Sequence, residues 1–295
     1  MVMNMKEKVT LGEWLNQWLK LRSTQLRPRT IEQYERLIRL HAVPIAGKKL
    51  KKVDAEDVQE LLADICEAGK GRTAEQLYVL LCTAFKQAVL MKRIKENPML
   101  AVIRPAHRAK NHDVWTPEEQ RKVLRALKND PYQLEILLGL LCGLRRGEIC
   151  GLRWSDIDLQ TGVIRIEQQR MRLADGRLVD VPPKSDAGRR VIPIPRSLRP
   201  VIASRAMIGG RVARLTPDGL SGALRRAEER AGVKHIGLHG LRHTMATNAV
   251  RGGVNLRVVQ QILGHSSYAL TARVYTHPDL EMLRYAVDAA YQSVV

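Results

Sequence analysis

The chain has 295 residues, of which 45% are hydrophobic and 27% charged, a length and composition typical of a globular protein of about two domains. No stretch approaches the roughly 20 apolar residues that span a bilayer, and the residues before Thr10 lack the apolar core of a secretory signal, so we expect neither. Lysine and arginine outnumber acidic residues by 49 to 30, and the net charge of +19 favours a polyanionic partner such as nucleic acid. Only 4% of residues are aromatic, which argues against a protein that stacks single-stranded bases.

Residues 9–96 predict a helical bundle, because apolar side chains recur there at helical spacing. Thr10 is the expected N-cap of the first helix, and the second follows the sequence Arg27-Pro28-Arg29. The breaks at Asn97-Pro98 and Arg104-Pro105 indicate a basic linker over residues 97–114. The four amphipathic patterns lie at residues 11–19, 30–40, 54–67 and 73–91.

A second domain is expected to begin at the capping box Thr116-Pro117-Glu118-Glu119 and to run over residues 115–279. Its predicted helices at 117–127 and 132–142 are followed by strands at 163–172 and 190–194, with a turn at Gly176, and helical patterns return from Asp218. The four cysteines lack metal-ligand spacing, so we expect reduced thiols in the core.

Positive charge is carried by different residue types in the two halves. Residues 1–110 contain 12 lysines and 9 arginines, whereas residues 111–295 contain 4 lysines and 24 arginines. The planar guanidinium group matches phosphate oxygens two at a time. The second half is therefore expected to make defined phosphate contacts, and the first half a looser electrostatic contact.

Two features of the second half present a cation where the chain changes direction. Gly143 is expected to stop the preceding helix in a left-handed conformation, which places Arg145 at a helix junction. Lys184 lies in a turn between strand-like segments, where neighbouring cations would lower its pKa. Taken singly, these residues also fit a basic helix end and a solvated turn lysine.

Three further features supply imidazole and phenol groups. His239 and Arg242 are three residues apart and therefore share one helix face. His265 follows Gly264 at what resembles a helix start, and Tyr275 comes ten residues later. A structural histidine and a core or surface tyrosine remain the ordinary explanations for each feature alone.

Together, these side chains fit a phosphodiester transesterification. Two arginines would neutralise the non-bridging oxygens, a tyrosine would attack phosphorus, a lysine would protonate the leaving 5′ oxygen, and two histidines would transfer protons or bind the phosphate. Acidic residues that would hold Mg²⁺ are not clustered in the sequence, so we expect neither a metal nor another cofactor. The candidate catalytic residues are Arg145, Lys184, His239, Arg242, His265 and the nucleophile Tyr275.

The ordered set resembles the tyrosine recombinase (phage integrase) family. That family has an arginine in a Gly-Leu-Arg context, a hairpin lysine, a His-x-x-Arg box, a Gly-His pair and a tyrosine nucleophile, and each element has a match here. The resemblance covers roughly residues 9–280. It is strongest to integrases of temperate phages and conjugative transposons, through residues 26–34 and 85–98.

The resemblance implies a fold that is mainly α, with a small antiparallel β-sheet in the second domain. The two domains would form a C-shaped clamp: a helical core-binding domain at residues 9–96, the linker 97–114, and an α+β catalytic domain at 115–279. The implied function is that of a site-specific DNA recombinase, which cuts and rejoins duplex DNA through a 3′-phosphotyrosyl intermediate and a Holliday junction.

The resemblance also implies partners. Paired recombination sites on double-stranded DNA would hold a homotetramer, assembled by exchange of the C-terminal helix at residues 280–295, although that helix could equally pack on its own domain. Accessory proteins for excision and DNA bending are expected, as is a cytoplasmic, nucleoid-associated location in a bacterial or phage-infected cell, with no membrane partner.

Two other functions fit part of the pattern. A type IB-like topoisomerase shares this chemistry but acts on single sites, and a catalytically silent DNA-binding regulator would have lost at least one of the six residues. Integrases of this kind commonly carry an additional N-terminal domain that binds arm sites, whereas residues 1–8 are expected to be a disordered leader. We therefore expect either a shortened form or a simpler recombinase without arm sites. Gly147, soon after Arg145, is expected to loosen the local turn.

Overall fold

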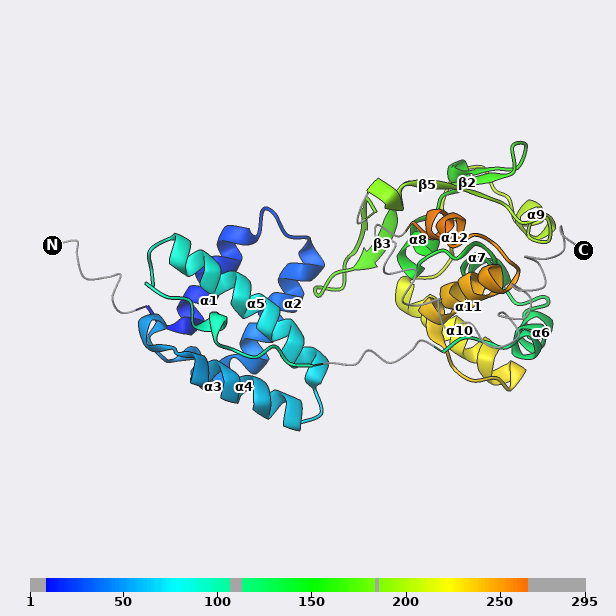
Figure 1. Ribbon diagram of the computed structural model, residues 1–295. Helices are drawn as coiled ribbons and strands as arrows, with labels where there is room; N and C mark the ends of the chain where they lie inside the picture. The colour runs from blue at the N-terminus through cyan, green and yellow to red at the C-terminus, as the bar shows by residue number, and fades with distance from the viewer. Residues whose placement is uncertain (1–8, 107–112, 184–185, 265–295) are drawn as a thin grey trace, which may run out of the picture. The chain divides into compact units, whose positions relative to one another are not determined.

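The computed structural model describes residues 9–106, 113–183 and 186–264. These residues fall into two compact units (Figure 1). The first consists of residues 9–106, and the second consists of the described residues from 113 onward without residues 173–175, which group with the first. The predicted fold class is confirmed: both units are mainly helical, and the second contains antiparallel strands. None of the helices in the described ranges has the length and apolar character needed to cross a membrane.

The helices of the first unit begin where the sequence provides caps. Thr10 and Asp54 form capping boxes with Glu13 and Asp57. Pro28 occupies the first turn of α2, where its missing N–H loses no hydrogen bond, so this helix begins two residues before its predicted start. The elements are α1 (Leu11–Arg22), α2 (Pro28–His41), α3 (Val43–Ala46), η1 (Leu50–Lys52), α4 (Ala55–Glu67), α5 (Gly71–Leu90) and η2 (Pro98–Leu100).

The core of the first unit is apolar and closes around two tryptophans of α1. Trp14 and Trp18 are almost fully buried, and the Trp14 indole N–H donates to the Ala84 carbonyl oxygen at 3.1 Å. Met99 and Val102 are buried in the same core. The packed part of this unit therefore extends beyond residue 96, where the sequence predicted the linker to begin.

The helices of the second unit surround a separate core. Helices α7 and α11 pack against each other in its interior (Figure 1). The predicted capping box at Thr116 and Glu119 and the left-handed Gly143 at the end of α7 are both present. The helical elements are α6 (Pro117–Ala126), α7 (Gln133–Cys142), α8 (Arg146–Gly151), η3 (Trp154–Asp156), η4 (Asp186–Gly188), α9 (Arg199–Ala203), α10 (Pro217–Ala231), α11 (Gly237–Arg251) and α12 (Leu256–Leu263).

The strands form two antiparallel sheets rather than one. The first has the order β1-β2-β5, with Ile164 opposite Ile192, and the second pairs β3 with β4. The strand predicted over residues 163–172 is therefore two strands. Between them, the Gln168 side-chain amide donates to the carbonyl oxygen of Gly151 at the end of α8, where the chain passes from the first sheet to the second. The strands are β1 (Ile157–Asp158), β2 (Val163–Ile166), β3 (Gln169–Arg172), β4 (Leu178–Val181) and β5 (Arg190–Pro193).

Helix α8 lies close against β3 because it carries two glycines on the facing side. A Cβ atom at Gly151 would lie 2.9 Å from the Gln169 Cα atom, and one at Gly147 would lie 3.1 Å from the Arg170 carbonyl oxygen. The sequence predicted only that Gly147 loosens a turn. In the structure, this glycine allows the close approach of a helix and a strand.

Candidate active site

Arg145 is the N-cap residue of α8 and has an extended backbone. Its side chain is 33% exposed and bonds the Glu148 carboxylate through Nη1 at 2.7 Å. Its Nη2 donates to the Gly264 carbonyl oxygen at 3.0 Å. Because a guanidinium group has five N–H donors, this geometry fixes Arg145 and still leaves it partly open to a ligand.

Arg242 lies on α11 and is buried, with 1% of its surface exposed. Its guanidinium donates to the Gly143 carbonyl oxygen at 2.7 Å and to the Leu263 carbonyl oxygen. Gly143 has φ +66°, and a Cβ there would lie 2.7 Å from the Leu263 side chain. Only glycine therefore satisfies both the backbone conformation and the close packing beside Arg242.

The two arginines meet at the C-terminal end of α12. Arg242 binds the carbonyl of Leu263 and Arg145 binds the carbonyl of Gly264, the next residue. The last carbonyls of a helix lack helical partners and carry partial negative charge, so cations stabilise them. Gly264 has φ +63° and ends α12, and the helix start expected at His265 lies outside the described residues.

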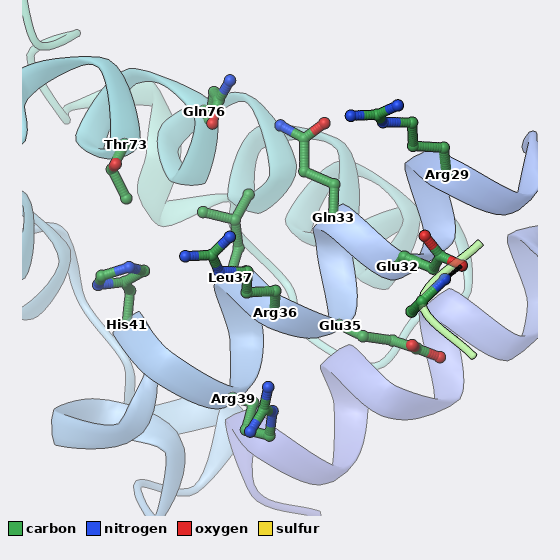
Figure 2. Close-up of a pocket in the computed structure, with 11 residues that line it drawn as sticks. Arg29, Glu32, Gln33, Glu35, Arg36, Leu37, Arg39, His41, Thr73 and Gln76 are labelled. Carbon is green, nitrogen blue, oxygen red and sulfur yellow. Dashed lines mark hydrogen bonds between the residues drawn. The ribbon is translucent and has the colours of Figure 1, made fainter. Parts of the chain in front are cut away.

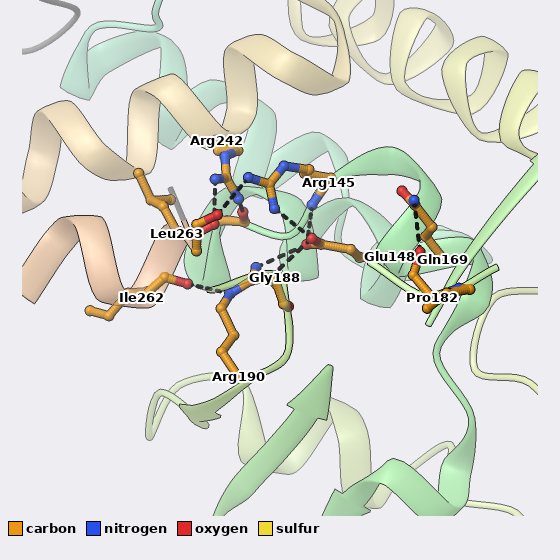
Figure 3. A network of polar contacts seen from close by, with 11 residues as sticks. Arg145, Glu148, Gln169, Pro182, Gly188, Arg190, Arg242, Ile262 and Leu263 are labelled. Atoms are coloured by element: carbon orange, nitrogen blue, oxygen red, sulfur yellow. Dashed lines mark hydrogen bonds and ion pairs between the residues drawn. The ribbon is translucent and has the colours of Figure 1, made fainter. Parts of the chain in front are cut away.

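Glu148 and Arg190 complete this group, and neither was predicted as a functional residue. Glu148 is 2% exposed and lies between Arg145 and Arg190 (Figure 3). Arg190 forms a two-pronged contact with it, Nη1 to Oε1 at 3.0 Å and Nη2 to Oε2 at 2.9 Å. Burial alone would raise the pKa of Glu148, but the Arg190 hydrogen bond and the charges of Arg190 and Arg145 outweigh it and lower that pKa to about 2.

A sequence signal existed for one of these two residues. Glu148 is three residues after Arg145, which is the spacing of a capping box, and its carboxylate accepts from the Arg145 backbone N–H at 2.9 Å. No local signal distinguishes the environment of Arg190, the first residue of β5, from that of Arg189 directly before it, because both are arginines at the start of a strand. Their different environments arise only from the tertiary fold.

His239 lies in the first turn of α11, three residues before Arg242, as the sequence predicted. It is exposed, and its ring packs edge-on against the buried His243, with 4.7 Å between ring centroids and an interplanar angle of 89°. An exposed imidazole next to a buried guanidinium can reach a ligand bound by that guanidinium. The sequence did not distinguish the structural role of His243.

The other three candidate residues, Lys184, His265 and Tyr275, lie outside the described residues. Their neighbours on the chain are described: Gly188 and Arg190 follow Lys184, and Gly264 directly precedes His265. Arg190 contacts the carbonyls of both Gly188 and Ile262. The described part of the site therefore includes Arg145, His239 and Arg242.

The cysteines are free thiols that do not contribute to this site. Cys142 and Cys150 are buried, and burial raises the pKa of each to about 12, so neither forms a thiolate near neutral pH. Cys66 and Cys82 are half-buried, which corrects the expectation that all four lie fully inside the core.

Comparisons with known proteins identify related sequences and folds. The profile of the Phage integrase family matches residues 113–282, and that of the phage integrase N-terminal SAM-like domain matches residues 10–65. A tyrosine recombinase of Thermosipho africanus is 30% identical over 261 residues, covering 84% of this chain and 88% of that protein.

Two solved structures share the fold. The Tn1549 transposon integrase in complex with transposon right end DNA has a TM-score of 0.80 at 21% identity, covering 95% of this chain and 99% of that chain. A lambda integrase tetramer bound to a Holliday junction has a TM-score of 0.70 at 21% identity, covering 94% and 81%. With family profiles that match most of its length, this chain belongs to the phage integrase family, the tyrosine-type site-specific DNA recombinases.

Proposed function

We propose that this chain cuts and rejoins duplex DNA by transesterification, with Tyr275 as the nucleophile. The observation that carries the proposal is that guanidinium groups from two separate elements, Arg145 at the start of α8 and Arg242 within α11, bind successive carbonyls at the end of α12. The sequence continues directly from there into His265 and then Tyr275. A phosphate held by both arginines would thus lie near the segment that carries the phenol.

The proposed reaction exchanges one ester for another. The Tyr275 Oη atom forms a bond to phosphorus and loses its proton, while the bond from phosphorus to the 5′ oxygen breaks and that oxygen takes a proton from Lys184. A 5′-hydroxyl of another strand then attacks the phosphotyrosyl ester, which restores a phosphodiester and releases Tyr275. Because each cleaved ester is replaced by an ester, the exchange needs no external energy source.

The arginines supply the electrostatic part of this mechanism. Arg145, Arg190 and Arg242 carry three positive charges against the single carboxylate of Glu148, so this group has a surplus of positive charge. Negative charge accumulates on the non-bridging oxygens as phosphorus becomes five-coordinate, and fixed donors stabilise it more than mobile water does. Arg145 and Arg242 are thus placed to lower the barrier to both steps.

His239 and His265 are proposed to assist in proton transfer and phosphate binding. His239 is exposed and directly precedes the turn of α11 that carries Arg242. An imidazole has an ordinary pKa of about 6.5 and can donate or accept a proton near neutral pH. Replacing His239 with Ala is expected to slow strand cleavage and leave DNA affinity unchanged, measured as adduct formation and as binding of labelled duplex.

DNA binding by the first unit is proposed to involve the pocket between α2 and α5 (Figure 2). Arg29, Arg36 and Arg39 line it together with Glu32 and Glu35. Burial, followed by the charges of Lys70 and Arg36, lowers the pKa of His41 in this pocket. The amide side chains of Gln33 and Gln76 lie in the same pocket. Guanidinium groups suit phosphates, and amides suit the edge of adenine in the major groove.

This division of roles has a direct test. Arg36→Ala should weaken binding to all duplexes alike and reduce the salt dependence, because a phosphate contact carries no sequence information. Gln33→Ala should instead change the sequence preference recovered from a random-sequence duplex library. Equal effects of both variants on every sequence would contradict base reading by this pocket.

The catalytic proposal is tested by Tyr275→Phe, which removes one oxygen atom. Wild-type protein should form a covalent protein–DNA adduct that survives denaturant, and the variant should bind the same DNA and form none. An adduct that persists in the variant would refute the assignment of the nucleophile. Plasmids with one and with two sites distinguish recombination from simple relaxation of supercoils.

Assembly on DNA is also a proposal. We propose a tetramer on paired sites that is joined by exchange of residues 280–295 and resolves a Holliday junction. The lambda integrase tetramer bound to such a junction supports the tetrameric state. Deleting residues 281–295 should abolish recombination of two sites and leave cleavage of single sites. Unimpaired recombination would exclude the exchange.

We further propose that the chain acts in the cytoplasm of a bacterial or phage-infected cell, on nucleoid DNA, with accessory proteins that bend DNA or direct excision. The net charge of +19 supports a location on DNA. Fluorescent fusion protein should colocalise with the nucleoid. Recombination with purified protein and DNA alone would show that accessory proteins are dispensable.

A further inference from the structure

Arg190 directs its guanidinium entirely toward protein atoms. Its side chain is 6% exposed. Nε donates to the Ile262 carbonyl at 2.6 Å, and Nη1 donates to the Gly188 carbonyl at 3.1 Å in addition to the two bonds with Glu148. Four of the five N–H donors of Arg190 are thus taken by protein acceptors, so we expect its contribution to the reaction to act through its neighbours.

Those neighbours belong to three separate segments (Figure 3). Gly188 ends η4, which follows Lys184 in the sequence, Glu148 lies on α8 and binds Arg145, and Ile262 lies in the last turn of α12, before His265 in the sequence. One side chain thus joins the three segments that lead to proposed site residues. A Cβ at Gly264 would lie 3.0 Å from the Arg190 Cδ atom, which shows how closely the segments meet.

The charge balance shows what Arg190 does for Arg145. Each oxygen of Glu148 accepts one bond from Arg145 and one from Arg190. With Arg190 present, these three residues carry a net charge of +1. Without it, the carboxylate would neutralise Arg145 completely, and both of its oxygens would compete with a phosphate for the Arg145 fork.

We propose that Arg190 is a positioning residue, which shares the Glu148 carboxylate so that Arg145 keeps both its place and its charge for the DNA phosphate. This proposal rests on the proposed function, since Arg145 must bind a phosphate for the effect to matter.

The chain provides a matched control one residue away. Arg189 is 61% exposed and lies 4.0 Å from Glu167 across an exposed ion pair. Arg189→Met removes the same charge from the same segment but leaves Glu148 paired. A difference between the two variants therefore reports on the buried contact and not on the overall charge of the protein.

The test measures two quantities on a nicked duplex that carries the site recovered from a random-sequence library with wild-type protein. One is the single-turnover rate of adduct formation with protein in excess, and the other is the dissociation constant from fluorescence anisotropy. Arg190→Met should lower the rate about 10- to 100-fold, because a displaced guanidinium loses its alignment with the phosphate. The dissociation constant should be unchanged, and Arg189→Met should leave the rate unchanged.

A charge-restoring variant separates positioning from simple support of the fold. Adding Glu148→Gln to Arg190→Met returns the group to a net charge of +1 and should raise the cleavage rate severalfold above that of Arg190→Met. Arg190→Lys, which keeps the charge but not the fork, should cleave at an intermediate rate. These two variants also carry the test if Arg190→Met does not fold, which thermal unfolding would reveal.

Three results would overturn the proposal: an unchanged rate in Arg190→Met, no recovery on adding Glu148→Gln, or rate and affinity that fall together in all the variants. Wild-type protein that forms no adduct would refute the proposed function itself. An adduct formed equally well by wild type and Arg190→Met would refute only the role of Arg190.

Discussion

The two units of the molecule bury different kinds of side chain. Within the described residues, the fully buried side chains of the first unit are all apolar, whereas the second unit buries several charged and polar groups. An isolated buried charge is strongly unfavourable, and pairing only partly offsets that cost. The buried polar residues are Glu135, Glu148, Glu228, Arg242, His243 and Thr244.

This difference shows what each unit is built to do. In the first unit, apolar packing holds a scaffold whose charges lie on the surface, where they can meet a polyanion. In the second, Arg242 and Glu148 lie inside the fold and are held by hydrogen bonds and an ion pair, which suits the fixed donors that the proposed function requires. The interior of the first unit should therefore be indifferent to pH, and that of the second should respond to it.

The largest effect is expected from the core of the first unit. Trp14→Ala removes an almost fully buried indole and its bond to Ala84, and should lower the free energy of unfolding of that unit by about 3–5 kcal/mol. Hydrogen exchange resolved by peptide would show the loss in α1 and α5 and not in α7 or α11. Leu21→Ala, on the same helix but 55% exposed, is the control and should have little effect.

Acid should instead destabilise the second unit more than the first. The pKa of Glu148 is about 2 in the fold, below its ordinary value, so its stabilisation is present above the unfolded-state pKa and is lost as pH falls from about 5 to about 2. The lost stability is about 3 kcal/mol. Denaturant unfolding of the second unit across this range measures it, and Glu148→Gln should flatten the dependence. A steeper acid response in the first unit would contradict the comparison.

A Cβ atom added at a closely packed glycine should lower stability by less than the two changes above. Gly151→Ala would place a Cβ 2.9 Å from the Gln169 backbone and should destabilise the second unit by about 1–3 kcal/mol. Gly12→Ala in the first unit meets the Ala46 side chain at 3.2 Å and should cost less. Gly222→Ala on α10 would meet only the end of the Arg226 side chain, at 3.4 Å, and should stabilise by about 0.5–1 kcal/mol, because alanine favours a helix. Thermal melts of the three variants test this order.

The smallest effect is expected from the loss of a helix cap, and it should be equal in the two units. Thr10 and Thr116 form the same capping box with Glu13 and Glu119. Replacing either threonine with alanine should lower the stability of its unit by about 1 kcal/mol. Unequal losses in chemical denaturation would show that the units differ in helix capping as well as in their cores.

Much of the local structure was predictable from the sequence. Helix positions followed from apolar periodicity and from caps such as Thr10 and Thr116, because these signals act within one or two turns. The left-handed stop at Gly143 and the shared face of His239 and Arg242 followed for the same reason. The strands were predicted less well, because pairing partners lie far apart in the chain and the alternation over residues 163–172 continues through the crossing between sheets.

By itself, the sequence determined the helical segments, the excess of positive charge and the ordered set of candidate catalytic residues. Only the tertiary structure decided that Glu148 lies between two arginines, and that Arg190 rather than Arg189 is the second of them. The physical reason is that propensity and periodicity act over a few residues. The environment of a charge, by contrast, depends on which distant segments exclude water around it, here α8, β5 and the end of α12.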